Sequence, residues 1–290
     1  MFDNIFAAIE KWMRELLTGM VESNMSTMFT DVNEKTSEIA AQVGRTPQNW
    51  NSSVFSMIQN LSESVVVPIA GIIITLVLCY ELISMLTERN NLHDVDTWMF
   101  FKYFVKMWIA VYLVSHTFDI AMAVFDIGQS VVNSSSGIIR GNTAIDISSL
   151  SMQMQAAMAT MAIGELVTLA LETLVVSWCL KILSVVITVI MYGRMIEIYL
   201  YTSLAPIPFA TMSNREWGHV GTNYFRGLFA LAFQAFLMMV CVAIYAALIS
   251  SVRISSNMHS ALIGVAAYTV ILCFSLMKTG SLSKQIFGSH

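Results

Sequence analysis

Five long apolar runs dominate the pattern of hydrophobic and polar positions along the chain. Each reaches the roughly 18–20 residues that an α-helix needs to cross the hydrocarbon core of a bilayer. A helix satisfies its backbone hydrogen bonds within itself, as a segment surrounded by lipid must. The pattern therefore predicts an all-α polytopic membrane protein. The expected spans cover about 65–87, 98–125, 164–192, 227–250 and 260–277, within a transmembrane domain of residues 64–278.

The first 20 residues carry an amphipathic pattern instead. Apolar side chains recur at steps of three and four residues, and charged ones fall on the other side. Residues 21–43 and 48–62 repeat this pattern more weakly. We expect residues 1–63 to form an amphipathic helical domain outside the hydrocarbon, too small for a rich core of its own. The residues expected to contact the membrane surface or, preferably, a neighbouring subunit are Phe6, Ile9, Trp12, Met13 and Leu16.

The stretch 193–212 is apolar and aromatic but contains Pro206 and Pro208. Proline has no N–H to donate, and it disfavours helical geometry in the residue before it. A helix that enters from Tyr199 should therefore end or kink near Ala205. Irregular backbone inside a membrane needs protein or water to satisfy it, so we expect a broken or re-entrant segment packed inside an assembly or lining a cavity. The alternative is a membrane helix with a simple kink.

Two further segments are polar. Residues 127–160 are rich in small side chains and have too few apolar ones for a span, so the pattern predicts a long loop that leads into a helix near Ser149. Residues 279–290 form a short polar tail.

The distribution of Lys and Arg predicts the orientation, because cytoplasmic loops of membrane proteins are enriched in both. If 193–212 does not cross, one side carries eight basic residues, and the other keeps two near the spans plus the four of the N-terminal domain. The N-terminus and 127–160 are then extracytoplasmic and the tail is cytoplasmic. If 193–212 crosses, the bias weakens. The eight are Arg89, Lys102, Lys106, Arg194, Arg215, Arg226, Lys278 and Lys284, and the two are Arg140 and Arg253.

Composition agrees with a membrane location. Of the 290 residues, 56% are hydrophobic and 12% are charged, which is about half the charge of a soluble domain. The four cysteines all lie in expected spans without a CxxC motif, so they predict neither a disulfide framework nor a metal site. With a net charge of −4, the chain offers no basic surface for a phosphate backbone, and no sequence-specific nucleic-acid binding is expected.

Several ionisable residues lie within the apolar segments, where a charge is costly and by default suggests a functional site. His116 and Asp119 are three residues apart and can share a hydrogen bond, and Arg194 can pair with Glu197 one turn away. Two interpretations stay open: these residues line a pore or translocate an ion, or they pair within or between subunits, which is favoured. The candidates are Glu165, Glu172, Lys181, His116, Asp119, Arg194 and Glu197.

The chain shows none of the short motifs that carry common enzyme chemistry. It has no Walker A lysine loop, no GxSxG, no HExxH and no cluster of His and Cys ligands. We therefore expect no catalytic residue, no cofactor and no metal, in a protein that is not an enzyme. Secondary transporters usually have paired broken helices in two related halves, and only one break occurs here.

Two stretches carry a resemblance to a known family: GRMIEIYLYTSLAPIPFATM at 193–212 and NREWGHVGTNYFRGLFALAFQAFLM at 214–238. With this order of elements, the chain resembles the TrbL-type (VirB-type) polytopic inner-membrane subunit of type IV secretion and conjugation machines. It is most similar to the versions in conjugative elements of Gram-positive bacteria. The resemblance implies a multi-pass protein of the bacterial cell membrane, with five spans, a sizeable outer loop after the second, the N-terminus outside and the C-terminus inside.

The resemblance also implies a function: a structural channel or scaffold component of the membrane complex of a conjugative DNA-transfer system. Its partners would be the lipid bilayer, further copies of itself in a ring (a pentamer), and other secretion subunits and ATPases, with relaxase-bound DNA as cargo. The alternative from a different class is a small-solute or ion channel or transporter that uses Glu165, Glu172 and Lys181. A third is a passive membrane anchor for a partner enzyme.

Overall fold

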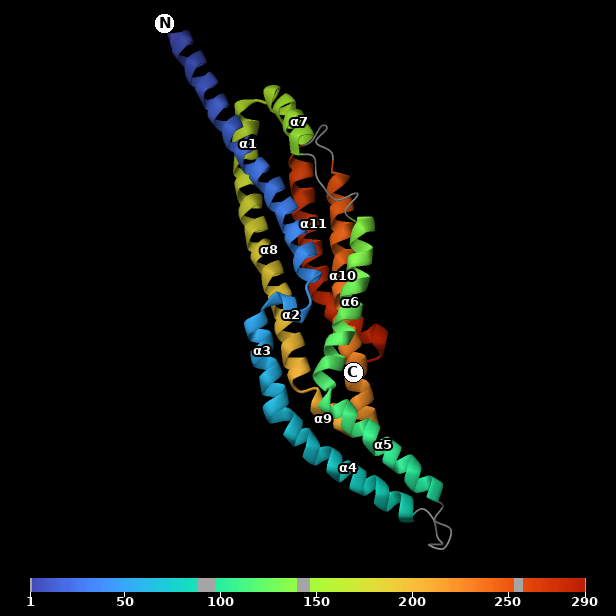
Figure 1. Ribbon diagram of the computed structural model, residues 1–290. Helices are drawn as coiled ribbons and strands as arrows, with labels where there is room; N and C mark the ends of the chain where they lie inside the picture. Colours follow the sequence, from blue (N-terminus) through green and yellow to red (C-terminus); the bar gives the residue numbers. More distant parts are fainter. Residues whose placement is uncertain (1, 88–96, 140–146, 253–257, 290) are drawn as a thin grey trace. The chain divides into compact units, whose positions relative to one another are not determined.

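The computed structural model describes residues 2–87, 97–139, 147–252 and 258–289, and every regular element in these ranges is a helix (Figure 1). Three arginines that were counted in predicting the membrane orientation lie outside the described residues: Arg89, Arg140 and Arg253. The segment 140–146 of the expected loop also lies outside them. In chain order the elements are α1 (Phe2–Val43), α2 (Pro47–Trp50), α3 (Ser52–Leu61), the π-helical turn η1 (Ser62–Val66), α4 (Val67–Thr87), α5 (Thr97–Ser115), α6 (Thr117–Ile139), α7 (Ile147–Ala159), α8 (Ile163–Ser203), α9 (Pro206–Thr211), α10 (Gly218–Ser250) and α11 (Met258–Phe287).

In the described ranges, five helical stretches are long and apolar enough to cross a membrane, which confirms the expected all-α polytopic fold. Most of them run beyond the expected spans. Helix α8 has 41 residues and is therefore about 61 Å long, twice the ~30 Å of a hydrocarbon core. Hydropathy finds the apolar part of a helix but not its ends, because a helix can continue into water. The five stretches are Ser52–Thr87, Trp98–Ser115, Ile163–Ser203, Gly218–Ser250 and Met258–Phe287.

The chain divides into two compact units. Unit 1 comprises Met1–Val43, Ser134–Met191 and Met238–Lys278, and unit 2 comprises Gly44–Asn133, Tyr192–Leu237 and Thr279–His290. Helices α8, α10 and α11 each contribute to both units. Residues 1–63, expected as one domain, are shared between the units rather than packed as a body of their own.

In unit 1, the C-terminal half of α1 packs along α8 (Figure 1). Met25, Met28 and Ile39 on α1 are fully buried. Side-chain hydrogen bonds join the two helices at both ends of this contact, from Asn24 to Thr173 and from Lys35 to Thr188. The apolar pattern of 21–43, weak in sequence, is therefore a real packing face. Its partner helix is more than a hundred residues away in the chain.

In unit 2, α4 and α5 lie side by side and α9 packs against both (Figure 1). Their contact is apolar, with Ile74, Ala110 and Phe209 in one buried cluster. The Tyr103 hydroxyl of α5 donates to the Leu78 carbonyl of α4 at 2.9 Å. This three-helix arrangement holds the short helix α9 in place.

The helix break near Ala205 is confirmed, because α8 ends at Ser203 and α9 begins at Pro206. Proline is well suited to the first turn of a helix, where its missing N–H has no partner to lose. With six residues, α9 is about 9 Å long, which is far too short to cross a bilayer.

The expected single span over 98–125 consists of two helices, α5 and α6, which meet at His116. Ser115 donates its hydroxyl to the carbonyls of Val111 and Tyr112, and Thr117 donates to Leu113 and Val114. Such back-bonding competes with the backbone ladder and bends helices. The hydropathy of this stretch gives no sign of the bend, since the residues on both sides remain apolar.

The expected loop over 127–160 is largely helical in its described parts. Helix α6 continues to Ile139, and α7 covers Ile147–Ala159. The predicted start of a helix near Ser149 agrees with α7, but α7 ends before α8 instead of continuing into it. Helix α6 persists because Val124, Gly128 and Val132 are buried at steps of four residues. Polar residues lie between these positions, so the composition of the segment does not indicate the packing face.

Candidate functional site: polar groups of the membrane helices

The three charges predicted on the third span do not gather at one place. Glu165 accepts a hydrogen bond from the Ala162 N–H at 3.0 Å and so caps the start of α8. Glu172 pairs with His259 of α11 within unit 1. Lys181 is exposed near the middle of α8 and has no ion-pair partner among the described residues. Two of the three charges thus have polar partners that explain them structurally, and Lys181 has no such partner among the described residues.

Arg194 and Glu197 lie one turn apart on α8, in unit 2, but have different partners. Arg194 is only 7% exposed, and its Nη2 donates to the Leu231 carbonyl of α10 at 3.4 Å. Its buried Nε has no hydrogen bond among the described residues. Glu197 accepts from Lys284 of α11 at 2.9 Å. The pair expected between Arg194 and Glu197 is therefore replaced by contacts to two other helices.

Further polar side chains join α10 to the end of α11 beside Arg194. Gln234 donates to the Thr279 hydroxyl at 3.4 Å, and the Ser283 hydroxyl donates to the Ala230 carbonyl at 2.6 Å. Gly280 permits this approach, since a Cβ there would lie 3.2 Å from the Gln234 amide nitrogen. We call Arg194, Gln234, Thr279 and Ser283 the buried polar cluster. Gln234 stands out in sequence as the one strong polar group of its apolar run, whereas Thr279 and Ser283 give no such signal.

His116 and Asp119 do not form the hydrogen bond expected between them. The His116 ring stacks on Tyr112 with centroids 4.2 Å apart, and its Nδ1 lies 3.1 Å from the Tyr112 carbonyl oxygen. Asp119 is exposed, and no ion pair forms between it and the described part of the chain. The two side chains thus belong to different environments at the α5–α6 bend.

Asp119 instead begins an exposed polar stripe along α6. The five residues of this stripe are separated by three and four positions, so they share one helix face, and all five are exposed. The opposite face packs in unit 2 through Ala121, Val124 and Phe125. A charged face is costly in hydrocarbon, so this one requires water or a polar protein surface. The polar face of α6 consists of Asp119, Ala123, Asp126, Ser130 and Asn133.

The predicted contact residues of the N-terminal helix are uncovered by the rest of the chain. Phe6 is 68% exposed and Trp12 61%, and Ile9, Met13 and Leu16 are also exposed. One polar contact ties this part of α1 to unit 1, from Arg14 to the Met161 carbonyl at 2.8 Å. The apolar face of this helix end has no cover within the described chain.

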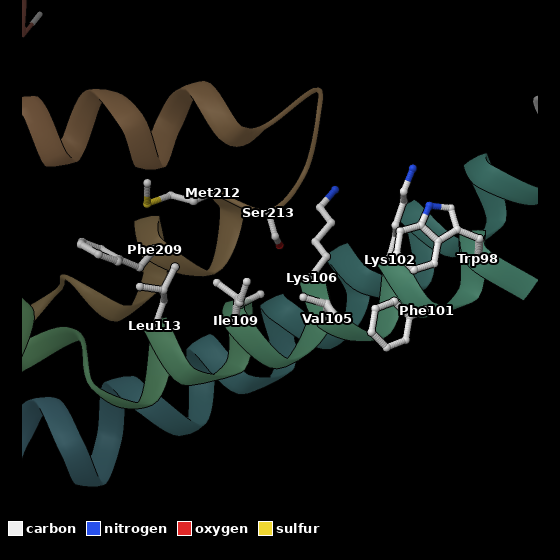
Figure 2. A pocket seen from close by; sticks show the side chains of 11 residues that line it. Trp98, Phe101, Lys102, Val105, Lys106, Ile109, Leu113, Phe209, Met212 and Ser213 are labelled. Atoms are coloured by element: carbon white, nitrogen blue, oxygen red, sulfur yellow. The ribbon is translucent and has the colours of Figure 1, made fainter.

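A pocket of about 500 Å³ opens between α5 and the α9 segment in unit 2 (Figure 2). Its walls are mainly apolar, with Ile109, Leu113 and Phe209 toward one end. Two lysines, Lys102 and Lys106, lie along the same face of α5 toward the other end (Figure 2). Lys106 forms an ion pair with the buried Glu81 of α4. The sequence showed the two lysines near a membrane interface but not the cavity that they line.

Within the described ranges, no three His, Cys, Asp or Glu side chains gather as metal ligands would. A family model described as TrbL/VirB6 plasmid conjugal transfer like protein matches residues 32–206, more than half of the chain. Of the two stretches that carried the resemblance, 193–212 lies mostly inside this match and 214–238 lies beyond it. None of the curated proteins and none of the solved structures compared with the chain matches it.

Proposed function

The chain belongs to the TrbL/VirB6 plasmid conjugal transfer-like family, and from this premise we propose that it is a structural channel or scaffold subunit of a conjugative DNA-transfer complex. Family membership and the five apolar helices make it a multi-pass membrane protein of a bacterium. The family match is the observation that carries the proposal. Residues 1–63 and the 127–160 region lie outside the cytoplasm in this arrangement, and residues 279–290 lie inside.

Uncovered apolar surface supports assembly into a homo-oligomeric ring, a pentamer by family resemblance. On α8, exposed apolar side chains recur at steps of three and four residues along the whole helix. Lipid can cover such a stripe, but the exposed face of α1 lies on a helix too rich in charge to enter hydrocarbon. A second protein surface can cover both the α8 stripe and the exposed apolar face of α1. The α8 stripe includes Leu171, Trp178, Ile182, Val185, Val189 and Ile196.

Polar surface supports a water-filled path in the same assembly. The polar face of α6 carries Asp119 and Asp126, and α1 carries charges along its length. Neither helix can turn these groups toward lipid at low cost. Acidic walls repel a DNA backbone, so they favour passage without tight binding. The relaxase–DNA cargo, the secretion ATPases and the other membrane subunits are the partners of this proposal.

The oligomer is tested with two variants of α1 that create the same residue on opposite faces. Trp12→Ser removes an exposed apolar side chain, whereas Lys11→Ser removes a side chain of the polar face whose contact with Glu15 is exposed. Cryo-electron microscopy of the detergent-extracted wild type should show a closed ring. Trp12→Ser should yield smaller species and Lys11→Ser the wild-type ring. A compact monomer in the wild type would refute the ring.

The transfer function is tested by deleting the gene in its conjugative element. Transfer should cease while the element is maintained normally, and wild-type chain supplied in trans should restore transfer. Normal transfer from the deletion strain would contradict the proposal. A solute-transport role predicts instead that the purified chain alone conducts ions in liposomes and that Glu172→Gln alters the flux. We expect no such flux, since Glu172 is held by His259.

The proposed orientation has its own test. A C-terminal fusion to a fluorescent protein that matures only in the cytoplasm should fluoresce, because residues 279–290 lie inside. A C-terminal fusion to alkaline phosphatase, which is active only outside, should be inactive. The reverse pair of results would invert the topology.

A further inference from the structure

We propose that the pocket between α5 and α9 binds one anionic phospholipid, with its phosphate at Lys102 and an acyl chain along the apolar end. The pocket and its lining lie entirely within unit 2. The inference requires a membrane location but not the transfer function.

The polarity of the pocket changes along its length as it does along a lipid. Lys102 and Lys106 lie toward one end, and Leu113, Phe209 and Met212 lie toward the other (Figure 2). The twelve residue steps of α5 from Phe101 to Leu113 span about 18 Å. This length is close to the ~15 Å of hydrocarbon in one leaflet. One acyl chain therefore fits the groove from the lysines inward.

The charge balance selects a monoanionic headgroup. Lys106 is already neutralised by Glu81, which is 7% exposed, and Lys102 has no acidic partner among the described residues. Among the described residues, the polar end thus keeps one net positive charge, since Arg215 and Glu216 in the neighbouring turn cancel formally. A zwitterionic lipid leaves this charge unbalanced, whereas a phosphatidylglycerol-type phosphodiester neutralises it. Basic pockets between membrane helices are suited to such headgroups.

An aromatic pair marks the headgroup level. The Lys102 ammonium lies 5.7 Å from the centroid of the Trp98 ring, and Trp98 stacks on Phe101 with centroids 5.3 Å apart. Trp side chains are enriched where hydrocarbon meets headgroups, and lysines near helix ends extend toward that level. Trp98 is 57% exposed and lines the pocket, so it can report the bound lipid.

The test uses the full chain in phosphatidylcholine liposomes that contain a minor fraction of lipid brominated on its acyl chains. Bromine quenches tryptophan fluorescence on contact, and the difference between wild type and Trp98→Phe isolates the Trp98 signal. Brominated phosphatidylglycerol should quench Trp98 several-fold more than brominated phosphatidylcholine at the same fraction. Lys102→Gln should lower this preference about fivefold, the contribution of one lysine at an anionic surface.

The matched control is Lys181→Gln, which removes an exposed lysine of α8 in the other unit and should leave the preference unchanged. Equal quenching by the two lipids in the wild type would overturn the proposal, as would a preference that survives Lys102→Gln. Absence of Trp98 quenching by either lipid would show that a protein segment covers the groove. Loss of the preference on adding soluble glycerol phosphate would show a site for free phosphate instead.

Discussion

The crossing of α6 and α10 gives the sharpest prediction, because the two backbones meet there without a side chain between them. A Cβ at Gly128 would lie 2.8 Å from the carbonyl oxygen of Ala232 and 3.0 Å from its carbonyl carbon. Ordinary van der Waals contact begins at about 3.4 Å. Gly128→Ala therefore forces the helices apart by roughly 0.6 Å. Since the nearest atoms are backbone, no rotamer change relieves the overlap.

The expected magnitude follows from comparison with a second glycine in unit 2. A Cβ at Gly71 of α4 would have no neighbour within 4 Å, so Gly71→Ala gains helix propensity without strain. Gly128→Ala gains the same propensity but also overpacks the contact, which costs about 1–3 kcal/mol. The two variants should therefore differ by this strain alone. At roughly 2–4 °C per kcal/mol, Gly128→Ala should melt several degrees below Gly71→Ala.

The assay is thermal unfolding of both purified variants in the same detergent, followed by intrinsic tryptophan fluorescence and near-UV circular dichroism. Gly71→Ala should melt at or slightly above the wild-type temperature. If Gly128→Ala melts with or above Gly71→Ala, α6 and α10 do not pack closely at Ala232, and the helical continuation of α6 loses its physical reason.

The same unfolding assay checks three further substitutions. Ser283→Ala removes the hydroxyl that donates to the Ala230 carbonyl and should lower the free energy of unfolding by about 0.5–1.5 kcal/mol. An unchanged melting temperature would show that this hydrogen bond does not contribute to stability. Tyr199→Phe deprives the Pro47 carbonyl of a 2.6 Å hydrogen bond and should cost about 1–3 kcal/mol, and a neutral result would mean that water reaches this carbonyl. Arg194→Met should be neutral or stabilising, because it removes a buried charge that has no acidic partner in direct contact among the described residues. A loss larger than that of Tyr199→Phe would show that Arg194 has a stronger partner.

The sequence by itself determined the features that depend on local chemistry. The five apolar stretches follow from the transfer free energy of their own side chains, and the end of α8 follows from the geometry that Pro206 imposes on its neighbours. The exposed face of α1 was visible for the same reason, as a local period of three and four residues.

The tertiary structure decided which groups meet. Glu172 lies 87 residues from His259, and Glu197 lies 87 residues from Lys284, so no local sequence pattern predicts either ion pair. Ser115 and Thr117 bend a helix whose hydropathy is unbroken. The pairing of distant charges and the space between α5 and α9 depend on which faces of separate helices pack together. Hydropathy and periodicity are properties of one helix at a time, and they do not determine which helix faces pack together.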